Sequence, residues 1–157
     1  MKRTAKPDAA AELHARVFVS LLRTADLLSR DAEALLKPFS VSATQYNILR
    51  ILRGAGPDGL ACREIGCRLI SRDPDITRLL DRMESRKLIV RAREAQDRRV
   101  VKTRIAEEGL RLLAELDQPV RETHRRQFRR FTAKELRALL DLLDRTREQA
   151  EPAPSRD

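Results

Sequence analysis

A short predicted helix, from Pro74 to about Arg86, carries side chains that can read bases in duplex DNA. Arg78 and Arg82 are four residues apart, one helical turn, and Thr77 lies at their flank. A helix fits the major groove, where Arg can pair with guanine through two hydrogen bonds and Thr can contact a thymine methyl group. The spacing therefore predicts a base-reading surface, with a row of ordinary solvated charges as the alternative.

A second charged group, Asp97-Arg98-Arg99, separates two predicted short strands at 88–93 and 100–105. At the tip of a hairpin these arginines could reach backbone phosphates or the adjacent minor groove, whose negative potential attracts arginine. A solvated turn is again the alternative.

Apolar spacing predicts how this helix packs against the rest of the protein. Ile76, Leu79, Leu80 and Met83 stand at i, i+3, i+4 and i+7, which gives one buried face. Asp73-Pro74 predicts the start of the helix, because an acidic N-cap residue followed by proline favours the first turn. A shorter helix is expected before it, at about 62–69.

Longer helices are expected on both sides of this region. One runs from Asp8 to about Leu36, and its wide apolar stripe requires more than one neighbour, including a second subunit. S-x-x-Q at positions 42–45 predicts a capping box for a helix that ends at Arg53 with Gly54 as C-cap. A helix over 106–130 contains Pro119, which is expected to kink or split it. T-x-x-E at positions 132–135 predicts the capping box of the last helix.

Charge favours a polyanionic partner. The 157 residues carry a formal net charge of +9. The segment from Arg72 to Arg104 alone holds eleven Lys or Arg against six Asp or Glu. Aromatic residues make up only 3%, so stacking on single-stranded bases is not expected. No apolar run reaches the roughly 18 to 20 residues of a membrane helix, and no secretory signal is evident, so a cytoplasmic protein without a membrane partner is predicted.

Three stretches resemble the MarR-type transcriptional regulators: SATQYNILRILRGAGPDGLACREIG (42–66), DPDITRLLDRMESRKLIVR (73–91) and DRRVVKTRIAEEG (97–109). The resemblance implies a mainly α fold with a small β-wing, a winged helix-turn-helix with N- and C-terminal dimerisation helices. It also implies a homodimer on palindromic duplex DNA, acting as a repressor released by a small anionic or aromatic ligand. The interpretation predicts a single domain over 8–150, with a winged core at about 40–105 and dimerisation helices at 8–37 and 106–150. Residues 1–7 and 151–157 are expected to be disordered.

The resemblance also assigns roles to individual residues. Thr77, Arg78 and Arg82 become the contacts of the recognition helix, and Asp97 braces Arg99 for the minor groove. The predicted DNA-binding residues are Arg72, Asp73, Pro74, Thr77, Arg78, Arg82, Asp97, Arg98 and Arg99. The sequence departs from the family pattern at Lys87, where a glycine is usual, and at Ala106, where a capping Thr is usual.

Other chemistry finds less support. Cys62 and Cys67 are expected to be small buried core residues rather than redox sensors. His14 and His124 stand alone, so neither metal nor cofactor is predicted. The basic cluster at 121–130 is expected to be a solvated face, and no enzyme motif is present. Two alternatives to a ligand-controlled regulator remain open, namely an architectural DNA-binding protein and a protein-interaction module that retains the fold.

Overall fold

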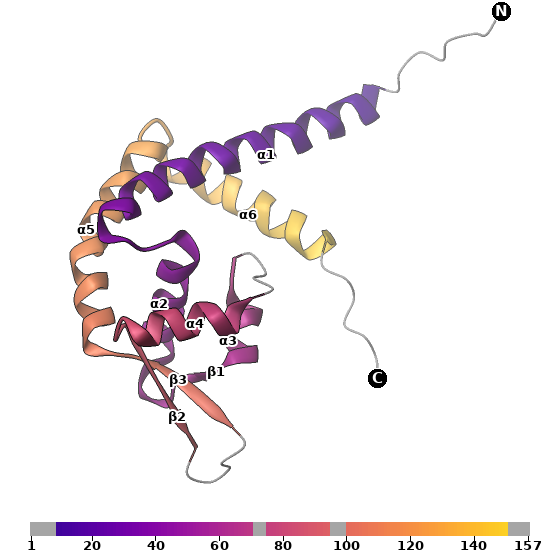
Figure 1. The fold of residues 1–157 in the computed structure, drawn as a ribbon. Coiled ribbons are helices and arrows are strands. Elements are labelled where there is room, and N and C mark those ends of the chain that lie inside the picture. Colours follow the sequence, from indigo (N-terminus) through magenta and orange to yellow (C-terminus); the bar gives the residue numbers. More distant parts are fainter. Residues whose placement is uncertain (1–8, 71–74, 95–99, 151–157) are drawn as a thin grey trace, which may run out of the picture. The chain divides into compact units, whose positions relative to one another are not determined.

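Helices dominate the fold, and a small sheet extends from one side of them (Figure 1). The computed structural model describes residues 9–70, 75–94 and 100–150. Its helices are α1 (Ala9–Leu36), α2 (Ala43–Ala55), α3 (Cys62–Arg68), α4 (Ile76–Ser85), α5 (Glu107–Phe128) and α6 (Ala133–Ala150), and its strands are β1 (Leu60–Ala61), β2 (Ile89–Arg93) and β3 (Val101–Ile105). The mainly α fold with a small β-wing is confirmed.

The chain divides into two compact units, Met1–Thr123 and His124–Asp157. The first unit holds the helices α1 to α4, the sheet and most of α5. The second holds the end of α5 and α6. Among the described residues, no helix has both the length and the apolar character needed to cross a membrane.

The core of the first unit gathers apolar side chains from α2, α3, α4, β2 and α5. Leu79, Leu80 and Met83 of α4 are buried and Ile76 is half-buried, as the i, i+3, i+4, i+7 pattern predicts. The other core residues are Ile48, Leu49, Leu52, Leu60, Ile65, Leu88, Ile89 and Leu113. Burial of these side chains holds α4 firmly with its polar side outward.

The sheet is antiparallel in the order β1-β3-β2. Ile89 pairs with Ile105 and Arg93 with Val101, so β2 and β3 form the hairpin predicted from the sequence. The two-residue strand β1 was not predicted, because so short a segment has no visible alternation. Gly59 directly precedes β1 and has a φ of 65°, a conformation that favours glycine. A Cβ added at this position would stand 2.6 Å from the Thr103 carbonyl oxygen, so β3 also leaves no room for a side chain here.

Both predicted capping boxes are present. The Ser42 hydroxyl accepts from the Gln45 amide at 3.1 Å, and the Ser42 amide donates to the Gln45 side chain at 3.1 Å. Thr132 and Glu135 make the equivalent pair of bonds before α6. The predicted C-cap at Gly54 is wrong: α2 ends at Ala55, and its C-cap residue is Gly56, with φ 68°. Gly54 lies within the helix and does not take positive φ, so it continues α2 instead of ending it.

Proline does not split α5, contrary to one of the two expectations for Pro119. The helix is assigned without interruption from Glu107 to Phe128. A bidentate ion pair holds α5 against α2 at Asp117, two residues before Pro119. Arg53 of α2 donates to both Asp117 carboxylate oxygens, at 2.8 and 3.0 Å. This hydrogen bonding from Arg53 holds the pKa of Asp117 below its usual value.

Candidate nucleic-acid interface

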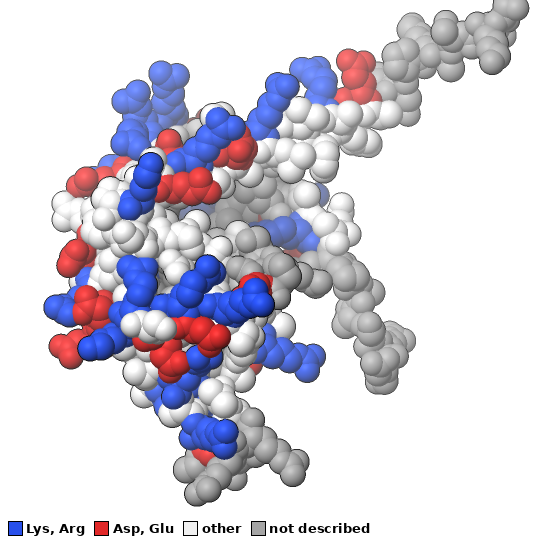
Figure 2. Space-filling model, viewed as in Figure 1, with Lys and Arg blue, Asp and Glu red and all other residues white. Residues whose placement is uncertain are grey.

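The outward side of α4 presents the three predicted base contacts that the structure describes. Thr77, Arg78 and Arg82 are all exposed, opposite the buried apolar face. The Arg78 side chain is 81% exposed and pairs only loosely with Asp75, at 3.5 Å. In Figure 2, basic side chains project from the region of α4 with acidic side chains directly beside them. These arginines are therefore available to a ligand in solvent.

The start of α4 differs from the prediction. The helix begins at Ile76, and Asp75 is the N-cap residue, with φ −116° and ψ 34° and no capping bond from its side chain. Asp73 and Pro74, the predicted start, lie outside the described residues, as does Arg72. The prediction from Asp73-Pro74 located the region of the helix start correctly, but it made Pro74 the first helical residue, two positions before Ile76.

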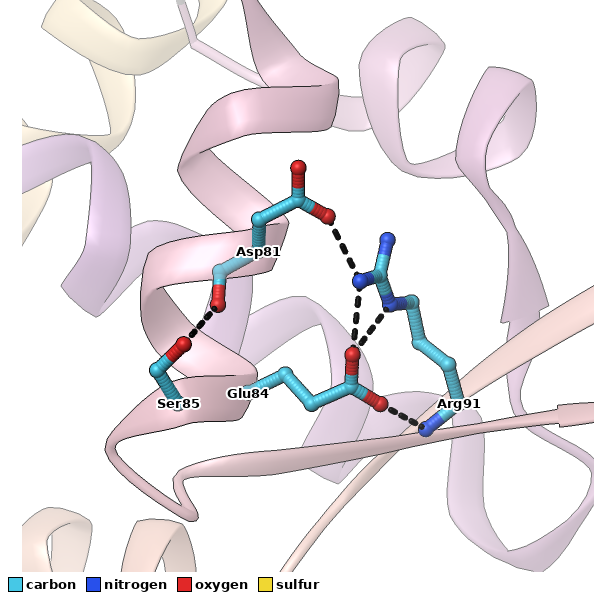
Figure 3. A network of polar contacts seen from close by, with 4 residues as sticks. All are labelled: Asp81, Glu84, Ser85 and Arg91. Atoms are coloured by element: carbon cyan, nitrogen blue, oxygen red, sulfur yellow. Dashed lines mark hydrogen bonds and ion pairs between the residues drawn. The ribbon is translucent and has the colours of Figure 1, made fainter.

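Two carboxylates on α4 are held by one arginine of the adjacent strand (Figure 3). Arg91 Nε and Nη2 donate to Glu84 Oε2 at 2.9 and 2.6 Å, and Nη2 also donates to Asp81 Oδ1 at 2.6 Å. The main-chain N–H of Arg91 donates to the other Glu84 oxygen at 3.1 Å. Hydrogen bonding from Arg91 holds the pKa of Glu84 below its ordinary value. Asp81 and Glu84 thus share one cation from within the chain, which offsets part of their negative charge.

From the sequence alone, Arg91 was assigned no role other than as one of the basic residues between Arg72 and Arg104. The available signal was a pair of acids three residues apart on one helix, followed after a turn by an arginine on a short strand. Whether that arginine faces the helix depends on how the chain reverses, which residue types alone do not specify.

The turn from α4 to β2 has a residue of unusual conformation. Lys87 takes φ 57°, in the left-handed region, at the position where the family pattern has glycine. Its N–H donates to the Glu84 carbonyl at 2.8 Å, and the Leu88 N–H donates to the Met83 carbonyl at 3.0 Å. These two bonds form a Schellman C-cap, so the turn keeps the usual geometry with Lys at a cost of about 1 kcal/mol relative to Gly.

Only the base of the wing is described. The Glu94 N–H donates to the Val100 carbonyl at 2.9 Å, and Lys102 pairs with Glu94 at 3.4 Å. Asp97, Arg98 and Arg99 lie outside the described residues, so their predicted roles stay predictions.

The cysteines are more accessible than predicted. Cys62 is half-buried and Cys67 is exposed, so Cys67 is not a core residue. Both lie on α3, a helix of seven residues, whose buried residue is Ile65. With 3.6 residues per turn, Cys67 two positions further along turns away from the core. No group of three or more His, Cys, Asp or Glu that could hold a metal occurs among the residues that the structure describes.

Comparisons with known proteins agree on one family. The sequence profile of the MarR family matches residues 41–101. The crystal structure of a MarR transcription factor from Planctomyces limnophilus is 41% identical, covers 83% of this chain and 94% of its own, and superposes with a TM-score of 0.65. The HTH-type transcriptional repressor IacR of Pseudomonas putida is 28% identical over 81% of this chain and 75% of its own length.

A third relative was solved with nucleic acid. The transcriptional repressor CouR, bound to a 23-mer DNA duplex, is 26% identical, covers 90% of this chain and 99% of its own, and gives a TM-score of 0.75. These relatives are transcriptional regulators and not enzymes. With the fold, the exposed α4 and the wing strands described above, they confirm the resemblance seen in the sequence: the chain belongs to the MarR family of winged helix-turn-helix transcriptional regulators.

Proposed function

We propose that this protein is a repressor that binds a palindromic duplex as a homodimer and is released by a small ligand. The observation that carries the proposal is the exposed face of Thr77, Arg78 and Arg82 on a helix whose other side is fixed in the core. In the major groove, the two arginines would pair with guanines and Thr77 would contact a thymine methyl group. The transcriptional repressor CouR, solved bound to a 23-mer DNA duplex, supports duplex DNA as the partner. Such a regulator would act in the cytoplasm, the compartment that the sequence predicts.

Residues on either side of α4 complete the proposed interface. Arg72 would contact a backbone phosphate near the start of the recognition helix, since helix N-termini and arginine both attract phosphate, while Asp73 and Pro74 would set the start of that helix. In the wing, Asp97 would brace Arg99 in the minor groove, with Arg98 beside it at the phosphates. The hairpin geometry of β2 and β3 supports a wing at this position.

Exposed apolar side chains on α1 support the proposed homodimer. Leu13, Val17, Phe18, Leu22 and Leu27 are each at least half exposed. So many large apolar side chains on one helix are costly to leave in water and indicate a partner surface. The domain layout that we propose keeps a winged core at about 40–105 between dimerisation helices at 8–37 and 106–150. The predicted disordered ends, 1–7 and 151–157, lie outside the described residues.

A groove between the start of α2 and α4 could seat the releasing ligand. Its volume is about 570 Å³, and it is lined by Ser40, Ser42, Gln45, Leu79, Arg82, Ser85 and Arg86. Arg82 and Arg86 would attract an anionic group, while Leu79 offers apolar contact. A small aromatic acid bound here would engage Arg82 and withdraw it from DNA.

Fluorescence anisotropy tests the proposal directly. The full chain is titrated against a labelled duplex from upstream of its own gene and against a scrambled duplex, at several salt concentrations, with and without benzoate. A repressor prefers the first duplex, and benzoate releases it. Equal affinity for both duplexes, unaffected by benzoate, would indicate an architectural DNA-binding protein. Absence of salt-dependent binding to either duplex would refute DNA binding altogether.

A further inference from the structure

One ion-paired cluster joins the proposed recognition helix to the first strand of the wing. Arg91 of β2 bonds Asp81 and Glu84 of α4 through its guanidinium group, and Glu84 also through its main-chain N–H. Its side chain is only 24% exposed, against 81% for Arg78. Arg91 is therefore engaged inside the protein and is a poor candidate for a direct DNA contact.

The two carboxylates border the proposed base-reading face. At 3.6 residues per turn, Asp81 lies about 60° around the helix axis from Arg78, and Glu84 about 20° from Thr77. A carboxylate at this edge would repel DNA phosphates if no cation compensated it. Arg91 supplies one cation that the two carboxylates share, so it reduces this repulsion.

The main-chain bond adds a mechanical connection. β2 is an edge strand in the order β1-β3-β2, and Arg91 pairs with Thr103 on its inner side. Its N–H donates to Glu84 instead of to a further strand, so α4 caps this part of the sheet edge. The ion pairs of the Arg91 guanidinium group and the hydrogen bond of its main-chain N–H together fix the orientation of α4 relative to β2.

We propose that Arg91 is a positioning residue for DNA recognition, which locks α4 to the wing strand and offsets part of the negative charge of the two carboxylates beside its reading face. The inference rests on the proposed DNA binding. It predicts that Arg91 contributes to DNA affinity only through its ion pairs with Asp81 and Glu84, and not through a direct contact with a DNA phosphate.

A double-mutant cycle distinguishes a positioning role of Arg91 from a direct contact between Arg91 and DNA. Arg91→Met is made in the wild-type chain and in the background Asp81→Asn/Glu84→Gln, and each protein is titrated over a range of salt with the duplex from upstream of its gene. Arg93→Met is the matched control, since Arg93 lies on the same strand, is exposed and has no ion-pair partner among the described residues. Circular dichroism and thermal melting confirm that each variant is folded. Should Arg91→Met fail to fold, Arg91→Lys takes its place in the cycle.

A positioning role gives a distinctive result. Arg91→Met lowers affinity about tenfold in the wild-type chain, the order of a typical coupling between paired charges, and by less than about threefold in the neutralised background. The slope of log affinity against log salt stays unchanged, whereas each lost phosphate contact reduces it by about 0.9. The control Arg93→Met gives the same loss in both backgrounds.

Other results overturn the inference. An equal loss in both backgrounds, with a reduced salt slope, would make Arg91 a direct phosphate contact. Unchanged affinity of Arg91→Met, while the wild-type chain binds, would remove Arg91 from recognition but leave the proposed function intact. If the wild-type chain binds neither this duplex nor its scrambled form, the proposed function falls and the role of Arg91 falls with it.

Discussion

Helices α4 and α1 are both amphipathic, but α4 buries its apolar side within the chain, whereas α1 leaves most of its large apolar side chains exposed. Leu80 and Met83 of α4 are at most 1% exposed, whereas Phe18 and Leu22 of α1 are 62% and 57% exposed. Burial of its apolar face leaves α4 with a polar face for a ligand. Exposure of its apolar face leaves α1 in need of a partner. The same periodic pattern thus leaves a polar face exposed on one helix and an apolar face exposed on the other, which fits the proposed roles of α4 in DNA recognition and of α1 in subunit association.

The largest effect is expected on the α1 side. Phe18→Asp should abolish dimer formation, because each subunit loses an apolar contact of about 1.5–3 kcal/mol and gains a charge in the interface. The dissociation constant of the dimer, measured by sedimentation equilibrium, should rise more than about a hundredfold. Asp26→Asn, which removes only an exposed ion pair with Arg30, is the control. Undisturbed self-association of the Phe18 variant would show that α1 meets no partner through this face.

Met83→Ala tests the α4 side of the comparison. Met83 is fully buried, so its truncation should lower the free energy of unfolding by about 2–5 kcal/mol in urea denaturation. DNA affinity measured well below the melting temperature should change less than stability does, because Met83 faces away from the proposed contacts. A stability loss below about 0.5 kcal/mol would contradict a tightly packed α4.

A smaller gain is expected at the turn that follows α4. Lys87→Gly should raise the free energy of unfolding by about 1 kcal/mol, since glycine adopts the left-handed conformation without the Cβ penalty. Lys87→Ala keeps that penalty and provides the control in the same thermal or urea titration. Equal stabilities for the Gly and Ala variants would mean that the positive φ carries no cost here.

The smallest effect concerns pH. Because Arg91 lowers the pKa of Glu84 in the folded protein, the pair stabilises the fold above the ordinary carboxylate value of 4.5, and this contribution is lost as pH falls through the lower folded pKa. Glu84→Gln removes it. The difference in unfolding free energy between the wild type and this variant should be constant, and below about 1 kcal/mol, at neutral pH and should shrink below pH 4.5. A difference that grows as the solution is acidified would contradict the ion pair.

Features encoded within one or two helical turns could be predicted from the sequence. The capping boxes at Ser42 and Thr132 and the buried stripe of α4 depend on side chains three or four residues apart, and all appear in the structure. Helix limits were less accurate. Gly54 was predicted as the C-cap of α2, but Gly56, two positions further along, is the residue that takes positive φ and ends the helix.

For the candidate site residues too, local spacing could be predicted from the sequence, whereas contacts with distant elements could not. The exposure of Thr77, Arg78 and Arg82 followed from the position of the apolar residues on the same helix. Cys67 was misplaced because a single small residue on a short helix gives no periodic signal. The role of Arg91 could not be predicted, since its partners come from another element and meet it only after the chain reverses at Lys87.

The sequence by itself determined the family, the helix that faces outward with its arginines and the excess of positive charge around it. These properties depend on residue type and local spacing, which do not need the rest of the chain. Only the tertiary structure decided that Arg91 compensates the acids of α4, that Lys87 accepts a left-handed turn and that a short strand at Leu60 completes the sheet. Each of these depends on groups distant in sequence, or on a local cost offset by packing of the core, and therefore appears only when the whole chain is folded.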